Sequence, residues 1–333
     1  MDPNLLLTGL AGVIASAAPM IFAVLGETIT EKGGVINLSL NGLILLTAMA
    51  GFATAAATDS VLLGFVVGML IGAAVAAVVA FTSITLRQSQ IAIGFVLALV
   101  TRDLAYYLGS PFTGQSGPRV PSQPIPVLSE LPVVGRLLFD HNLVVYASFL
   151  LIVVSWLWIY RTYPGLMLQG IGERPTAAYV RGLNVNRQRY FYTIVGGALA
   201  GVAGPAYSLS VKAGWQGTIS GLDGIGWIAL AITIFGGWHP LRAAFGAYLF
   251  ALLQWLSVVL QPVLTGIPSQ VLQVAPFPLM ILALLLVNVG NTDWFGRKLA
   301  LLPERRRKRV QNLVRTLNIS PPAALGESFR EPH

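Results

Sequence analysis

The sequence contains no cysteine and few charged residues. Without cysteine the chain cannot form a disulfide, a thiolate nucleophile or a Cys-ligated metal site. Its three histidines (His141, His239 and His333) are too far apart in sequence to suggest a metal centre, so we expect no metal and no cofactor. Charged residues make up 10% of the chain, against about 25% in soluble domains. This composition excludes water as the solvent for most of the surface.

Long apolar runs fill most of the chain instead. Hydrophobic residues make up 55% of the sequence, and the mean hydropathy is +0.72. A helix of about 20 apolar residues spans the hydrocarbon core of a bilayer, which is about 30 Å thick. The runs lie near residues 5–25, 35–57, 61–86, 91–109, 142–160, 190–211, 223–236, 241–262 and 271–288. The run at 223–236 is too short to cross unaided.

These runs predict an all-α fold, namely a polytopic integral membrane protein with eight to ten transmembrane helices, including broken or re-entrant segments. We expect a transmembrane domain over residues 1–296. Residues 297–333 are polar and basic, so we expect a poorly ordered tail there.

Positive charge is concentrated in two places and predicts the topology. The segment 161–189 holds five arginines and one glutamate, and the tail carries the cluster Arg305–Arg309. The positive-inside rule places both in the cytoplasm, as expected for a multi-pass protein of the plasma (inner) membrane. A basic cluster directly after a last span more often contacts anionic membrane lipids than nucleic acid, so we expect no nucleic-acid partner.

Glycines recur at helical spacing in two of the runs. Gly64, Gly68 and Gly72 form overlapping GxxxG patterns, and Gly197 and Gly201 form another. Small residues at this spacing let helix backbones approach closely in lipid. We favour packing within one subunit over a seam between two copies.

Two polar, glycine-rich stretches interrupt the hydrophobic pattern, at 26–42 and at 212–227. Irregular backbone is tolerated at membrane depth only where protein or a water-filled cavity supplies hydrogen-bond partners, so such breaks indicate a transport pathway. The alternative for the first is an ordinary turn, with Asn37 or Asn41 capping the next helix. For Asp223 the alternative is an N-cap role, and for Trp227 a place in an interfacial belt.

Ionisable residues inside the runs are scarce, apart from Arg102 and Asp103 in the run at 91–109. This scarcity disfavours a proton-coupled carrier. The chain has no GxxxxGK[ST] phosphate loop and no clustered nucleophile, base or metal ligands. We therefore expect no enzyme, and any ATP that drives transport must bind to another subunit.

The basic connection also predicts a short exposed helix. Pro175 suits the first turn of a helix, and Gly182 suits its end. Ala177 and Ala178 give this helix an apolar surface, for which a merely solvated connection would have little use. A rigid element of this kind could be gripped by a motor subunit.

Three motifs together resemble a known family. They are Glu31-x-x-Gly-Val-Ile-Asn-Leu-x-Leu-x-Gly42, the stretch from Gly172 to Arg187, and Ala198-Leu-Ala-Gly-Val-Ala-Gly204. They resemble permeases of ABC importers of the branched-chain amino acid/ribose group, most closely its nucleoside and simple-sugar branch. The resemblance covers about residues 5–289. It implies a permease subunit that forms the pathway with a second permease subunit, two ATP-binding subunits and an extracytoplasmic substrate-binding lipoprotein.

The resemblance also implies roles for individual residues. It makes the segment 173–182 the coupling element that docks on the ATP-binding subunit, with Glu173, Arg174, Pro175, Ala177, Ala178 and Gly182 as its site residues. The pathway candidates are Asn37, Ser39, Asn41, Asp223 and Trp227. The branch usually has an acidic residue where Asn41 stands, glycine at Ser39 and asparagine at Ala98, which leaves the substrate open. A secondary carrier or channel that acts without an ATPase is the alternative.

Overall fold

The structure is a computed structural model that describes residues 3–282, except 213, 264–265, 269–270, 272–273 and 276, together with residues 321–330. Within these ranges it contains helices and loops but no strand. The α-helices are α1 (Pro3–Lys32), α2 (Leu40–Thr58), α3 (Val61–Ala80), α4 (Gln90–Gly109), α5 (Leu143–Arg161), α6 (Tyr163–Glu173), α7 (Pro175–Val180), α8 (Val185–Ala206), α9 (Ile225–Phe235) and α10 (Pro240–Leu260).

Among the described residues, eight helical segments are long and apolar enough to cross a membrane. They correspond to the first eight predicted runs, so the predicted polytopic all-α fold is confirmed. The short run near 223–236 reaches spanning length because a 3-10 turn at Gly217–Ser220 precedes α9. The ninth run, at 271–288, lies largely outside the described residues, as does the tail from 297 to 320.

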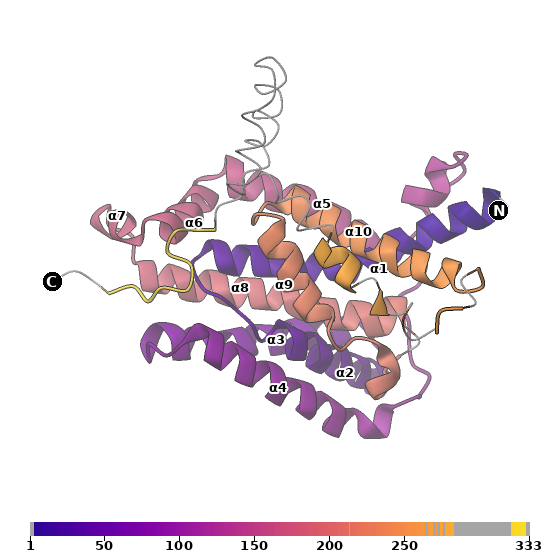
Figure 1. Cartoon of the computed structure of the whole chain (residues 1–333), viewed down its shortest axis with the longest axis horizontal. Coiled ribbons are helices and arrows are strands. Elements are labelled where there is room, and N and C mark those ends of the chain that lie inside the picture. Colours follow the sequence, from indigo (N-terminus) through magenta and orange to yellow (C-terminus); the bar gives the residue numbers. More distant parts are fainter. Residues whose placement is uncertain are drawn as a thin grey trace, which may run out of the picture.

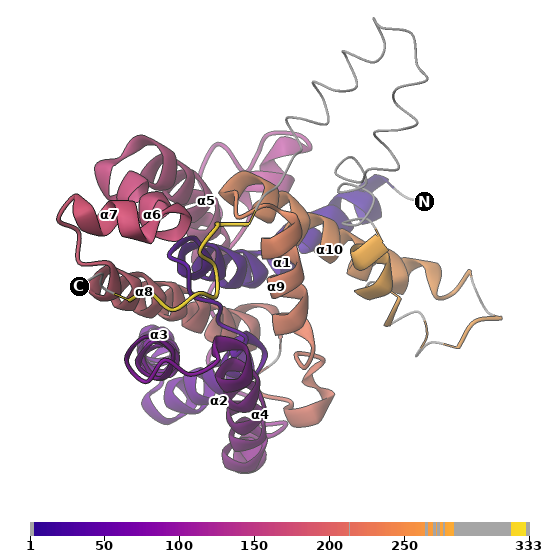
Figure 2. The same cartoon turned by 60° about the vertical axis from the view of Figure 1, so that its left-hand side comes forward.

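Three helices form the centre of the molecule. Helix α8 packs against both α1 and α2, with α3 and α4 on one side of this group and α5 and α10 on the other (Figures 1 and 2). The outer helices carry large apolar side chains on their exposed faces, for example Leu70, Val100 and Leu150. Such faces suit contact with lipid tails.

The glycines at helical spacing form the seam between α3 and α8. A Cβ atom on Gly72 would clash with the backbone of Gly197 and Gly201, and one on Gly68 would clash with Gly201 and Pro205. Because the two backbones approach this closely, only glycine fits on both sides. The predicted packing within one subunit is therefore what the structure has.

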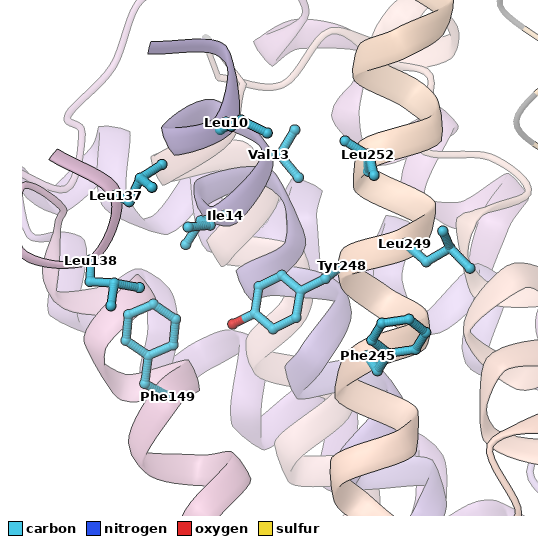
Figure 3. Close-up of a pocket in the computed structure, with 10 residues that line it drawn as sticks. All are labelled: Leu10, Val13, Ile14, Leu137, Leu138, Phe149, Phe245, Tyr248, Leu249 and Leu252. Carbon is cyan, nitrogen blue, oxygen red and sulfur yellow. The ribbon is translucent and has the colours of Figure 1, made fainter. Parts of the chain in front are cut away.

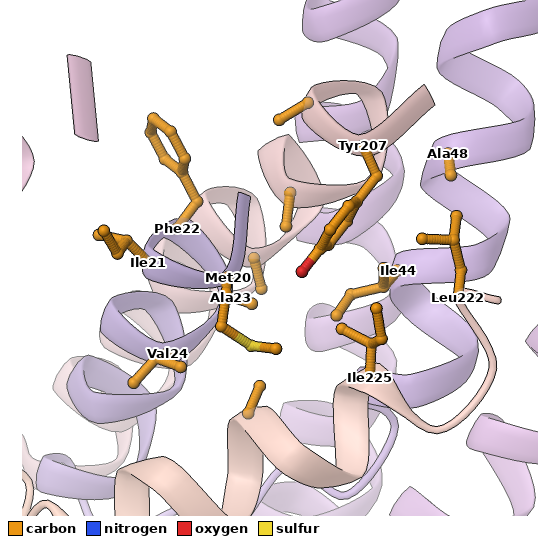
Figure 4. Packing of buried hydrophobic residues seen from close by; sticks show 14 of the residues in the cluster. Met20, Ile21, Phe22, Ala23, Val24, Ile44, Ala48, Tyr207, Leu222 and Ile225 are labelled. Atoms are coloured by element: carbon orange, nitrogen blue, oxygen red, sulfur yellow. The ribbon is translucent and has the colours of Figure 1, made fainter. Parts of the chain in front are cut away.

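A large apolar core joins the helices at their centre. Met20 of α1, Ile44 of α2, Tyr207 after α8 and Ile225 of α9 point toward one another (Figure 4). This core holds the short helix α9 against α1 and α2.

The first break in the pattern is shorter than the sequence suggests. The prediction of a break from Gly26 onward is wrong for residues 26–32, because α1 continues to Lys32. Thr28 and Thr30 donate hydroxyl hydrogen bonds back to the carbonyls of Val24 and Gly26. Charged residues do not break a helix, and the first helix-ending signal is the Gly33-Gly34 pair. The irregular segment is therefore residues 33–39, hereafter the α1–α2 loop.

Candidate functional site

The two predicted breaks meet at the side chain of Asn41. Its Nδ2 donates a hydrogen bond to Asp223 Oδ1 at 2.8 Å. Its Oδ1 accepts from the backbone N–H groups of Gly224 at 2.9 Å and Gly226 at 3.3 Å. One amide therefore joins the start of α2 to the break before α9, which lies more than 180 residues later in the chain.

These bonds overturn two capping alternatives. Asn41 lies in the first turn of α2, yet the N-cap of that helix is Ser39, which makes no side-chain capping bond. Asn41 instead supplies the acceptor for the first N–H groups of α9. The N-cap residue of α9 is Gly224, not Asp223. The Asp223 carboxylate is exposed and accepts hydrogen bonds from Asn41 and, at 3.4 Å, from the Tyr106 hydroxyl.

Close backbone packing holds this junction together. A Cβ atom on Gly226 would clash with the backbone of Asn41, so glycine is required where α9 meets α2. The next residue of α2, Gly42, packs in the same way against Ala98 and Thr101, in the middle of α4. The junction of Asn41 with Asp223 thus lies beside the middle of α4, at the start of α2 and just before α9. Broken helices of this kind typically form the substrate sites of transporters.

Asn37 and Ser39 are buried within the α1–α2 loop. The Asn37 Oδ1 atom accepts from the Ser39 hydroxyl at 2.5 Å and from the Ser39 N–H at 3.2 Å. The Asn37 N–H donates to Glu27 Oε1 at 3.1 Å. Asn37 Nδ2 is buried and has no partner among the described residues. These contacts fix the course of the loop beside the junction.

Two buried acids at the end of α1 were not predicted from the sequence. Glu27 and Glu31 are each 1% exposed, and Glu31 accepts a hydrogen bond from the indole N–H of Trp238. Their i, i+4 spacing, with no glycine or proline between them, was the signal that the helix continues. The membrane region therefore holds more ionisable groups than the apolar runs indicated.

Aromatic rings flank the junction. Trp227 is half-buried on α9, with its ring 6.0 Å from that of Phe95 on α4. Trp215 is fully buried, with its ring 6.1 Å from that of Tyr106. Trp215 is therefore a core residue, as is Trp238, which is 3% exposed.

The short exposed helix lies where the sequence predicts it. Helix α7 starts at Pro175 and is followed by Gly182, whose φ of +86° ends it with a left-handed residue. Glu173, Arg174 and Ala177 are exposed. Ala178, by contrast, is 6% exposed and packs in a second apolar cluster under the helix.

An exposed hollow lies between α6 and α7. It has a volume of about 470 Å³, and its lining combines apolar and cationic side chains, including Tyr163, Leu166, Met167, Arg174, Ala177 and Arg181. Val180 on α7 is 78% exposed nearby. A surface of this mixed character suits contact with another protein.

A larger hollow elsewhere is apolar. It measures about 520 Å³ and lies between α1, α5 and α10, where Leu10, Ile14, Phe149, Phe245 and Tyr248 line it (Figure 3). Among the described residues that line it, Tyr248 alone offers a side-chain hydrogen-bonding group, so this hollow suits an acyl chain and not a hydroxylated solute.

A helical membrane protein whose broken segments meet between its spanning helices has the architecture of a transport permease. The family model described as the permease component of the branched-chain amino acid transport system matches residues 9–289. The chain belongs to this family.

Three relatives agree with this assignment. The ABC transporter permease TsgC13 of Haloferax volcanii is 37% identical over 76% of this chain and 80% of its own length. The nucleoside ABC transporter permease NupC of Lactococcus lactis is 32% identical over 83% of this chain and 91% of its own length. The guanosine ABC transporter permease NupQ of Bacillus subtilis is 31% identical over 80% of this chain and 88% of its own length. No solved structure gives a significant match.

The protein is therefore a membrane-spanning permease subunit of an ABC importer, as the resemblance in its motifs predicted. The family implies ATP-binding subunits as partners. The named relatives are transport permeases.

Proposed function

We propose that this permease imports nucleosides or simple sugars across the plasma membrane. Two relatives are named for a nucleoside and for guanosine, and TsgC13 is provisionally named for glucose. A ribose or hexose ring is common to these solutes. We further propose a second permease subunit and an extracytoplasmic substrate-binding lipoprotein as partners, with α7 and the C-terminus in the cytoplasm.

The junction of Asn41 with Asp223 is the observation that carries the substrate proposal. Asp223 is exposed and hydrogen-bonded, so its carboxylate can accept from sugar hydroxyls without leaving a buried charge unpaired. The half-buried ring of Trp227 offers an apolar face to a sugar or a base. Asn37 and Ser39 support this site by shaping the neighbouring loop.

Helix α7 is the proposed coupling element. Glu173, Arg174 and Ala177 supply its exposed contact surface, and Pro175 and Gly182 define its start and its end. Ala178 is 6% exposed, packs beneath the helix and also lines the hollow between α6 and α7. For this reason Ala177→Arg is a cleaner test of docking than Ala178→Arg, which would bury a charge.

The test is uptake of labelled nucleosides and sugars into vesicles that carry the permease with its ATP-binding and binding-protein partners. ATP-dependent uptake of either class supports the proposal, and Ala177→Arg should abolish it while the permease itself still folds. Uptake of a solute without a sugar ring would refute the substrate class.

The alternative of a secondary carrier that acts without an ATPase is set aside, because the chain belongs to a family of ABC importer permeases. The importer predicts no uptake without ATP, which a pair of vesicle preparations with and without the ATP-binding subunits tests.

A further inference from the structure

Residues 321–330 pack across the end of the molecule that carries α7, although they are the last described residues of the chain. Figures 1 and 2 show this segment, in yellow, running beside α6 and the start of α8. Ala324 is 5% exposed and Phe329 is 9% exposed. The segment therefore has a defined course inside the region that the sequence analysis expected to be a poorly ordered tail.

Arg189 of α8 holds this segment. Its side chain is 2% exposed, and its two terminal nitrogens donate to the carbonyls of Glu327 at 2.6 Å and Ala324 at 3.4 Å. A buried guanidinium is costly unless hydrogen bonds compensate for its lost hydration. Among the described residues, both hydrogen-bond acceptors of Arg189 belong to the segment 321–330, so the burial of this charge depends on the segment.

The same ten residues contact the proposed coupling element. The Ala324 N–H donates to the Gly172 carbonyl at 2.9 Å, and the Ala323 N–H donates to Glu173 Oε2 at 3.3 Å. The Phe329 ring lies 5.7 Å from the ring of Tyr179 on α7.

They also contact the α1–α2 loop. The Gly326 N–H donates to the Gly34 carbonyl at 3.1 Å. Gly34 is three residues from Asn37, and the loop leads directly into the Asn41 junction. The segment is therefore hydrogen-bonded both to the proposed coupling element and to the loop that leads to the Asn41 junction.

The segment leaves the outer face of α7 free. None of its residues lines the hollow between α6 and α7, whose walls come from residues 163–183. A subunit docked in that hollow would not compete with the segment for space. The contacts thus favour transmission of movement over blockage of docking.

We propose that residues 321–330 are a strap that transmits movement of α7 to the α1–α2 loop, with Arg189 as the residue that positions it. This inference rests on the proposed coupling role of α7. When the ATP-binding subunits move α7, the strap moves Gly34 and with it the α1–α2 loop, which leads to Asn41.

The first test is truncation after residue 320 in the complete reconstituted transporter. We expect the ATP-binding subunits to co-purify and hydrolyse ATP, while uptake per ATP falls about tenfold, within the range of ordinary coupling energies. Because truncation leaves Arg189 buried without its acceptors, the truncated chain is also made with Arg189→Met, which should restore folding but not uptake.

In the full-length chain, Phe329→Ala should lower uptake per ATP and Phe329→Leu should largely restore it. Arg187→Ala, an exposed position on the same helix turn, is the matched control and should transport normally. Normal uptake per ATP by the truncated chain overturns the strap, and so does loss of the ATP-binding subunits, which would mean a structural role.

A second measurement tests docking of the strap without transport. Since the chain has no cysteine, Phe329→Cys and Ser328→Cys each create a single thiol. The buried position should react with a soluble maleimide about tenfold more slowly than its exposed neighbour, because it reacts only on local opening. Equal rates refute the docked strap.

The two proposals fail differently. If Ala177→Arg transports normally, the coupling role of α7 is wrong. If Ala177→Arg uncouples transport while every strap variant transports normally, only the strap is wrong.

Discussion

The junction between Asn41 and Asp223 allows a test by exchange of the two side chains. Asn41→Asp keeps the acceptor for the N–H groups of Gly224 and Gly226 but replaces the donor that faces Asp223. Two carboxylates would then stand where a 2.8 Å hydrogen bond now lies. The reciprocal change, Asp223→Asn, places a donor opposite the new carboxylate.

The expected size follows from the geometry. Two unit charges about 4 Å apart repel by about 4 kcal/mol at an effective dielectric constant of about 20. Because Asp223 is exposed, water screens part of this repulsion and one carboxylate can take up a proton, so we expect a loss of about 2 kcal/mol. For a chain of this size that corresponds to a fall in Tm of about 3 °C.

The assay is thermal unfolding of the purified permease in detergent, combined with uptake. Asn41→Asp should melt lower and transport poorly, and the double exchange should recover most of the lost stability. The coupling energy of the two changes should be about 1–3 kcal/mol. If the double variant is no more stable than Asn41→Asp, the hydrogen bond is not what joins the two breaks.

Three further predictions concern other parts of the chain. Gly201→Ala should destabilise the α3–α8 seam by about 1–3 kcal/mol, whereas Gly170→Ala, which faces open space, should not, as thermal unfolding of both can show. Ala177→Arg should leave the melting temperature unchanged but prevent co-purification of the ATP-binding subunit; retention of that subunit would contradict a docking role. Burial and the nearby charges of Arg242 and Lys32 lower the pKa of His239 below its usual 6.5, so the unfolded chain binds the proton more readily and stability should fall as the pH drops below 6.5. His239→Gln should flatten this dependence in denaturation measured between about pH 5 and 7.

Much of the fold follows from local properties of the sequence. A span of apolar residues identifies a membrane helix without reference to its neighbours, which is why the first eight runs match described helices. The same holds for α7, because Pro175 and Gly182 act on their own backbone. Glycine spacing identified the faces of α3 and α8 that pack together, since only close backbone approach requires glycine on both sides.

The site depends on contacts that local patterns do not encode. Asn41 could be identified as polar within a break, but its role as the acceptor for the start of α9 requires two segments to meet in space. Capping rules assign an N-cap to the residues next to a helix, so they pointed to Asp223. The end of α1 was predicted too early for a related reason. Hydropathy ends the span at Glu27 and Glu31, whereas the helix ends at the Gly33-Gly34 pair.

Charge at the junction also bears on the substrate. The nucleoside and sugar permeases that the motifs resemble usually have an acidic residue where Asn41 stands. In this chain the carboxylate of the pair is instead at Asp223. The pair here holds one carboxylate and one amide, and two carboxylates at this distance would repel. The double variant Asn41→Asp with Asp223→Asn therefore keeps the number of donors and acceptors but moves the charge from the segment before α9 to the first turn of α2. If the exchanged permease is stable and its preference among nucleosides and sugars changes, the charge contacts the solute; if the preference is unchanged, the junction only joins the helices.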